Sequence, residues 1–415
     1  MKRNRIIALV CSVALTATLF AGCGNKANNT KVDDKTKVET PSEPVTITVE
    51  VWGSSETETK LLDDQITAFN EANKSKKITL KKEVATGDYN QVMQTKIAAK
   101  TEPDLFFLDV SLVPSFVDKG AVAPIDEYMD KEDLKDFYPN LLEGFQVDGK
   151  TYGLPKDFNS LALFYNKKMF ADAGVTPPTT WAELETVSKK LTKGKVKALS
   201  LPDDSARFSS FMFQAGGKIV DGEEMVFNSP EAIKGFEFYY SFFKNGDAAS
   251  PADLGDGWPG ESLAKGNAAM VVEGGWLIPF MKDTAPELEY GIAELPKGEK
   301  QGNMLFTVAY AMSTNTKHPK EAAEAIKFLT GKESQQMTAD SGLAIPSRIS
   351  MATAYAENFP ERKALVDGTV YATPYSYGKN FSKINSELQK AGERLRLKKS
   401  PDGKSTLDEA IKAAK

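Results

Sequence analysis

The chain has 415 residues, of which 57 are acidic and 52 are basic, so its formal net charge is −5. This length allows two or three domains of about 100–200 residues each. The acidic balance and the lack of a basic stripe argue against a nucleic-acid partner. With a single histidine and two cysteines, the chain cannot form the common zinc sites, and a Ser-His-Asp catalytic triad is disfavoured.

The N-terminus has the pattern of a bacterial lipoprotein signal peptide. A basic start is followed by an uncharged, mostly apolar stretch that ends in small residues directly before Cys23. We therefore expect residues 1–22 to be cleaved and Cys23 to be diacylated, which anchors an exported protein to the outer face of the cell membrane. A single membrane-spanning anchor is the weaker alternative, because the stretch is short for a span of about 20 residues.

A polar tether is expected after the signal. Residues 23–44 lack aromatic residues and cannot bury enough surface to order themselves. The other cysteine, Cys11, lies in the signal, so the mature chain has no disulfide framework.

The folded body begins at Val45 with alternating strands and helices. We predict a strand at 45–52, a helix at 58–70, a strand at 78–84, a helix at 89–99 and a short buried strand at 104–108. This order indicates a doubly wound α/β unit. Ligands of such sheets bind beyond the carboxyl ends of the strands, which is where Trp52 and Asp109 are expected.

The later segments are predicted from the same periodicities. A hairpin at 149–155 leads into a strand at 161–166 and a helix that starts near Lys168. Thr180 is expected to cap a helix at 179–193. The remaining helices are expected at 230–243, with an aromatic-rich core face, at 319–329 and at 381–397.

No enzyme motif is present in the sequence. His318 precedes a proline at a helix start, and no Gly-x-Ser-x-Gly, phosphate-binding loop or dinucleotide fingerprint occurs. The acidic pairs at 203–204 and 223–224 are adjacent, so their side chains diverge and are expected on the surface. We expect no catalysis, cofactor or metal, although a surface glycosidase stays open because carboxylates are plentiful.

The four tryptophans separate into two groups. Trp181 opens a predicted helix and is expected in the core, whereas Trp52, Trp258 and Trp276 have glycine neighbours at strand ends or in loops. Exposed indoles near carboxylates and amides suit the stacking faces and hydroxyl groups of a sugar. The sequence thus favours a binding protein for an oligosaccharide, with a polyamine or phosphodiester ligand as alternatives.

Several stretches resemble one known family. They are VTITVEVWGSSETE, GDYNQVMQTKIAAKTEPDLFFLD, DGKTYGLPKDFNSLALFYNKKMF, GESLAKGNAAMVVEGGWLIPF and NTKHPKEAAEAIKFLTGKESQQ. On these residues the chain resembles the family 1 extracellular solute-binding proteins of carbohydrate ABC importers, the maltose-binding-protein-like group. The resemblance implies a monomer that delivers an oligosaccharide to a membrane permease.

The resemblance also implies a fold and a site. The fold would be a two-lobed α/β periplasmic-binding-protein-like fold (type II), each lobe a mixed sheet flanked by helices, with hinge crossovers at 154–158 and 306–308. Lobe I would hold 45–154 plus 308–347, and lobe II 155–307 plus 348–415. The implied ligand-binding residues are Trp52, Glu56, Asp88, Asp109, Asp157, Phe158, Asn159, Trp258, Glu273, Trp276, Tyr310, Arg348 and Tyr375.

Overall fold

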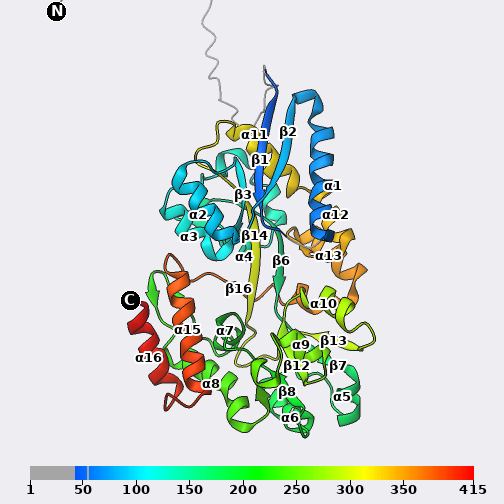
Figure 1. Cartoon of the computed structure of the whole chain (residues 1–415), viewed down its shortest axis with the longest axis vertical. Helices are drawn as coiled ribbons and strands as arrows, with labels where there is room; N and C mark the ends of the chain where they lie inside the picture. Colours follow the sequence, from blue (N-terminus) through cyan, green and yellow to red (C-terminus); the bar gives the residue numbers. More distant parts are fainter. Residues whose placement is uncertain (1–42, 54–55) are drawn as a thin grey trace, which may run out of the picture. The chain divides into compact units, whose positions relative to one another are not determined.

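The structure is a computed structural model that describes residues 43–53 and 56–415. The expected signal peptide, the lipidation site Cys23 and nearly all of the expected tether lie outside the described residues. Within the described part, the main strands form two mixed sheets flanked by helices (Figure 1). No helix there is long and apolar enough to cross a membrane.

The first sheet has seven strands in the order β15-β6-β14-β3-β1-β2, with β16 paired to β14. Strand β1 pairs in parallel with β2 and β3, which confirms the predicted doubly wound start of the fold. The longer β14 joins this parallel unit by pairing antiparallel with β3 and with β6. The strands are β1 (Val45–Val51), β2 (Ile78–Val84), β3 (Leu105–Asp109), β6 (Leu154–Ser160), β14 (Asn303–Met312), β15 (Ile345–Pro346) and β16 (Ala372–Pro374).

The second sheet has five strands in the order β11-β8-β12-β7-β13. Its central strand, β12, is buried along its whole length, as expected for an apolar strand covered on both faces. The strands are β7 (Ala162–Asn166), β8 (Lys197–Ser200), β11 (Ala248–Ala249), β12 (Ala268–Glu273) and β13 (Tyr290–Ala293). Two small hairpins pair β4 (Gln146–Val147) with β5 (Lys150–Thr151) and β9 (Val220–Asp221) with β10 (Glu224–Met225).

The helices that the sequence predicted are all present, at α1, α2, α5, α6, α8, α11 and α15, and the structure adds others that were not predicted. The Thr180 hydroxyl accepts a hydrogen bond from the Glu183 amide at the start of α6, which confirms the predicted N-cap. The aromatic face of α8 is buried in the core that covers the second sheet. The helices are α1 (Glu56–Ala72), α2 (Tyr89–Ala99), α3 (Val113–Asp118), α4 (Pro139–Glu143), α5 (Lys167–Ala173), α6 (Trp181–Leu191), α7 (Ser205–Gln214), α8 (Pro230–Asn245), α9 (Pro259–Ala264), α10 (Leu277–Thr284), α11 (Pro319–Leu329), α12 (Lys332–Ser341), α13 (Ile349–Asn358), α14 (Lys363–Asp367), α15 (Phe381–Arg396) and α16 (Gly403–Ala414).

The segments predicted as hinge crossovers lie in β6 and β14, which run side by side (Figure 1). All of β6 and β14 belongs to the seven-stranded sheet, so the predicted lobe borders at 154/155 and 307/308 fall inside these strands. Strand β16 also joins this sheet, although its sequence lies in the segment predicted for lobe II. Pairing between distant segments produces this arrangement, and local periodicity does not reveal it. The exact lobe borders stay a prediction.

Candidate ligand-binding site

Trp276 lies at the end of the buried strand β12, where the chain turns into α10. Two glycines make this turn possible. A Cβ on Gly274 would stand 2.3 Å from the Trp276 ring, and a Cβ on Gly275 would stand 2.5 Å from Oδ1 of Asn159. The indole therefore folds back over the backbone of Gly274, and Asn159 of β6 lies close to Gly275. Trp276 stays partly exposed and begins α10 at its N-cap position.

A buried ion-pair network fixes the Trp276 indole. Its Nε1–H donates to Oε2 of Glu273 at 2.7 Å, and Arg207 donates to the same oxygen at 2.6 Å. Arg207 also donates to Asp204 at 2.7 Å, and its guanidinium carbon lies 5.5 Å from the indole centroid. Asp204 is in turn the N-cap of α7 and accepts from the Ala206 amide. A carboxylate, a cation and a helix start thus set the orientation of one ring.

The Glu273 carboxylate has no exposed surface. Burial raises its pKa, and the charge and hydrogen bonds of Arg207 and the Trp276 indole act against this rise. Two buried polar atoms, Oε1 of Glu273 and Nε of Arg207, have no hydrogen-bond partner in the described part of the chain.

A further aromatic pair extends from Trp276. Phe306 of β14 packs edge-to-face on Trp276 at 5.2 Å between centroids, and Tyr375 packs on Phe306 at 5.4 Å. The Tyr375 hydroxyl donates to Asn385 at 3.0 Å. Burial, together with the charge of Asp204, raises the pKa of Tyr375 to about 12, so this phenol is protonated at neutral pH.

Asp109 ends β3 and lies opposite Val308, two residues along β14 from Phe306. Its carboxylate accepts from the amide and the hydroxyl of Ser111 at 2.9 and 2.5 Å. Burial raises the pKa of Asp109, and the bonds from Ser111 oppose that rise. The Asp109 charge contributes to the raised pKa of Tyr375, so the two groups interact electrostatically.

Trp52 follows β1 and packs edge-to-face on Tyr89 and Phe107, at 5.3 and 4.9 Å between centroids. It lines a cavity of about 50 Å³ together with Lys156 and Asp157 of β6. The indole thus contacts two aromatic rings and borders a cavity that Lys156 and Asp157 also line. The predicted residues thus gather in two groups, one around Trp276 and one around Trp52.

Three residues predicted as ligand contacts have buried side chains. Phe158 has no exposed surface and packs edge-to-face on Tyr138 at 5.4 Å. Tyr310 is buried against Phe107 at 5.4 Å. Arg348 is buried and donates to both carboxylate oxygens of Asp133 at 2.8 and 2.7 Å. Phe158 and Arg348 are enclosed by protein in this way, whereas buried Tyr310 borders the cavity beside Trp52. Ligand contact by these three residues stays a prediction.

The remaining predicted residues are Glu56, Asp88 and Trp258. Glu56 is exposed at the start of α1, and exposed Asp88 caps α2 by accepting from the Gln91 amide at 2.9 Å. Trp258 packs edge-to-face on Phe280 at 4.8 Å and belongs to a different hydrophobic cluster from Trp276.

Comparison with known proteins identifies the family. The sequence model of a family described as bacterial extracellular solute-binding protein matches residues 64–367. The chain belongs to this family. Membership implies an exported protein, in agreement with the N-terminal sequence.

Two curated relatives of this solute-binding protein align with different shares of the chain. A binding protein of Brucella abortus is 30% identical over 269 residues, which cover 62% of this chain and 65% of that protein. The chain thus spans less than two thirds of that relative. The galactooligosaccharide-binding protein of Bacillus subtilis is 25% identical over an alignment that covers 100% of this chain and 97% of that protein.

Solved structures show the fold of the solute-binding protein. An ABC substrate-binding protein of Listeria monocytogenes in complex with cycloalternan matches with a TM-score of 0.78 and 24% identity, over 90% of this chain and 98% of that one. The cyclic alpha-maltosyl-1,6-maltose binding protein of Arthrobacter globiformis matches with a TM-score of 0.79 and 22% identity, over the same shares. These likenesses confirm the expected two-lobed periplasmic-binding-protein fold.

Sequence reasoning missed several residues of the solute-binding protein's candidate site. The acidic pair Asp203 and Asp204 was expected on the surface, but both are only partly exposed and each pairs with an arginine. An Asp followed three residues later by Arg, at a helix start, was the signal that could have revealed the pairing of Asp204 with Arg207. Nothing in the local pattern marked Phe306, Lys156 or Glu58. No group of three or more possible metal ligands occurs among the described residues.

Proposed function

We propose that this solute-binding protein captures an oligosaccharide and delivers it to the permease of an ABC importer. The observation that carries the proposal is the partly exposed Trp276 indole, fixed by Glu273 and Arg207 and extended by Phe306 and Tyr375. A preset aromatic face beside polar groups suits a sugar ring, because the C–H face of the ring packs on the indole while its hydroxyls find hydrogen-bond partners.

The names of relatives support a carbohydrate ligand. Besides the galactooligosaccharide-binding protein of Bacillus subtilis, a multiple sugar-binding protein of Streptococcus mutans is 24% identical over 81% of this chain. The polar side chains near Trp276 also suit a sugar, because Asn159 and Asp109 can form hydrogen bonds with hydroxyl groups. We keep the ligand class at oligosaccharide and name no single sugar.

Binding without chemistry is part of the proposal. The carboxylates near Trp276 already accept hydrogen bonds from the protein, buried Glu273 from Arg207 and partly exposed Asp109 from Ser111. A glycosidase needs one free acid and one free base or nucleophile on opposite sides of a bond. We therefore expect labelled oligosaccharides to be recovered intact after incubation with the protein.

Export and anchoring complete the proposal. We propose that Cys23 is diacylated and that the polar residues 24–44 tether a monomeric binding protein to the outer face of the membrane. Two acyl chains reach the threshold for stable anchoring. Cys23→Ser should move the protein from the detergent phase to the aqueous phase of a Triton X-114 separation, and retention in the detergent phase would contradict the anchor.

The central test is the affinity of a Trp276→Ala variant. A thermal-shift panel of oligosaccharides first identifies a ligand, because binding to the native state raises the melting temperature. Calorimetry with that ligand should then show a loss of about 1.5–3 kcal/mol in binding free energy for Trp276→Ala, since the variant removes the aromatic face that the ligand covers. Trp181→Phe is the matched control, because Trp181 stacks on Phe238 at 3.9 Å in the α6–α8 core. Unchanged affinity in Trp276→Ala would remove this indole from the site.

A further inference from the structure

Strand β6 carries a β-bulge at Lys156. In the pairing of β6 with β14, Val308 lies opposite Asp157 while the next residue, Ala309, lies opposite Pro155. Lys156 is therefore the extra residue of β6 and has no partner in the ladder. Successive side chains of a regular strand point to opposite faces, and a bulge redirects them. The Lys156 ammonium can thus reach the carboxylate of its own neighbour, Asp157.

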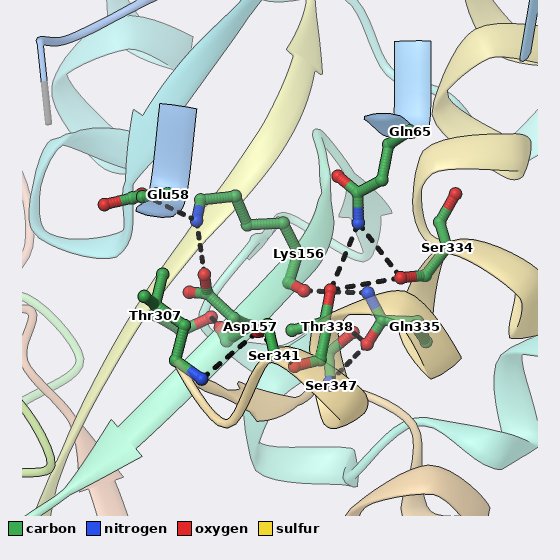
Figure 2. Close-up of polar contacts among 11 residues, drawn as sticks. Glu58, Gln65, Lys156, Asp157, Thr307, Ser334, Gln335, Thr338, Ser341 and Ser347 are labelled. Carbon is green, nitrogen blue, oxygen red and sulfur yellow. Dashed lines mark hydrogen bonds and ion pairs between the residues drawn. The ribbon is translucent and has the colours of Figure 1, made fainter. Parts of the chain in front are cut away.

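A second carboxylate completes a charged trio. Glu58, in the first turn of α1, lies 3.5 Å from Nζ of Lys156, whose side chain is only 12% exposed. Burial alone would lower the pKa of Lys156, but the charges of Asp157 and Glu58 outweigh it and raise the pKa. The lysine therefore stays a cation at neutral pH. Figure 2 shows the ammonium between the two carboxylates.

The trio lines the cavity beside Trp52. Phe107 also lines this cavity, and its ring centroid lies 5.1 Å from Nζ of Lys156, within cation–π distance. An ammonium has three N–H donors. In the described part of the chain the hydrogen bonds of this ammonium go to Glu58 and Asp157, which leaves one donor for a ligand.

The backbone of Lys156 is held firmly. Gln335 of α12 donates to its carbonyl at 2.8 Å, and the Gln335 oxygen accepts from the Ser347 amide at 2.7 Å and the Ser347 hydroxyl at 3.1 Å (Figure 2). On the other side, the Thr307 hydroxyl donates to the Asp157 carbonyl at 2.7 Å. The carbonyls of Lys156 and Asp157 are thus each bonded to a neighbouring element, which holds the backbone that carries the ammonium.

We propose that Lys156 is a specificity-determining residue, whose free donor binds a hydroxyl group of the ligand at the end remote from Trp276. This inference rests on the proposed function and deepens it. Along β6, Lys156 lies three residues, or about 10 Å, from Asn159, which borders the Trp276 turn. One ligand that reaches both residues is longer than a single sugar ring. Because two carboxylates surround one ammonium, the matching ligand end is neutral and hydroxylated rather than anionic.

The test compares chain lengths in a lysine variant. The probes are maltotriose with maltose, and galactotriose with galactobiose, measured by calorimetry on the full chain. Wild type should prefer a trisaccharide to its disaccharide, and Lys156→Met should lose at least tenfold in trisaccharide affinity while disaccharide affinity changes less than threefold. If Lys156→Met does not fold, the double variant Lys156→Met/Asp157→Asn, which also removes the charge left unpaired, should show the same loss of preference.

Lys96→Met is the matched control. Lys96 also pairs with a buried carboxylate of the seven-stranded sheet, Glu50, but it does not line the cavity. This control should keep the wild-type preference even if its melting temperature falls. A preserved preference in the Lys156 variants, an equal loss for both chain lengths, or no preference in wild type would overturn the inference alone. Failure of these probes and of every oligosaccharide in the thermal-shift panel to bind wild type would overturn the proposed sugar function as well.

Discussion

Arg207 neutralises a carboxylate that has no contact with solvent. Its guanidinium bridges Asp204 at the start of α7 and Glu273 at the end of β12, so one side chain connects a helix to a strand of the second sheet. Removing one partner of a buried pair leaves the other as an uncompensated charge. The structural role of Arg207 and its part in orienting Trp276 therefore cannot be separated by a single substitution.

A double-variant cycle of Arg207→Met, Glu273→Gln and the combination measures how strongly the two residues are coupled in stability. Arg207→Met should lower the free energy of unfolding by about 3–5 kcal/mol, because Glu273 stays buried without its cation. Arg207→Met/Glu273→Gln should recover much of that loss in urea denaturation. Lys218→Met is the control, since its pair with Asp221 is exposed and should contribute within about 0.5 kcal/mol. Additive losses in the double variant would show that the two residues are not coupled.

The sequence located the site only in part. Glycine neighbours marked Trp276 as an indole at a turn, and the structure places its ring against Gly274, where a Cβ would not fit. Ligand contact by this indole stays a prediction. The same sequence could not show that Phe158 and Tyr310 face inward, because burial depends on which segments cover each side of the sheet. Arg207 was missed because its partners lie 3 and 66 residues away in the chain, and only folding brings the second one close.

Among the elements, α9 is held by a loop carboxylate that precedes it. Asp256 accepts from Nζ of Lys265 at 2.9 Å and from the Asn267 amide at 3.1 Å, so the segments on both sides of the helix are joined. Burial would raise the pKa of Asp256, but the bonds from Asn267, Lys265 and Ser262 outweigh it and hold the pKa below its usual range. The charged form of Asp256 is therefore the stabilising form.

The sign of the pH dependence follows from this lowered pKa. The stabilisation is complete above the unfolded-state pKa of about 3.9 and is lost as the pH falls toward the lower folded-state value. Asp256→Asn should thus reduce the free energy of unfolding by about 1–3 kcal/mol at pH 7. The difference from wild type should shrink below about pH 3.9. Denaturation curves across this range check the expectation, and a difference that stays constant with pH would contradict it.

Element boundaries were predictable where the signal was local. The helices at 89–99 and 319–329 and the strand at 78–84 match the structure end to end, because their periodicity and caps lie within a few residues. Long-range pairing was not predictable. The ten-residue β14, its bulged pairing with β6 and the addition of β16 all depend on segments that meet only after folding.

Across the whole molecule, one hydrophobic cluster joins the two sheets. It includes Phe158 of β6 and Leu305 of β14 from the first sheet, and Phe164 of β7 and Val271 of β12 from the second. A core shared in this way couples the stability of the two sheets, because neither can lose its packing without exposing apolar surface of the other.

We therefore expect the ligand-free protein to unfold in one calorimetric transition, with equal calorimetric and van't Hoff enthalpies. An oligosaccharide that contacts residues of both sheets should raise the melting temperature of this single transition without splitting it. At a free ligand concentration of 100 times Kd the added stability is about 2.7 kcal/mol. Two resolved transitions in the free protein would show that the shared cluster does not couple the sheets. A ligand that shifts only one of them would bind one lobe alone, against a site built from both.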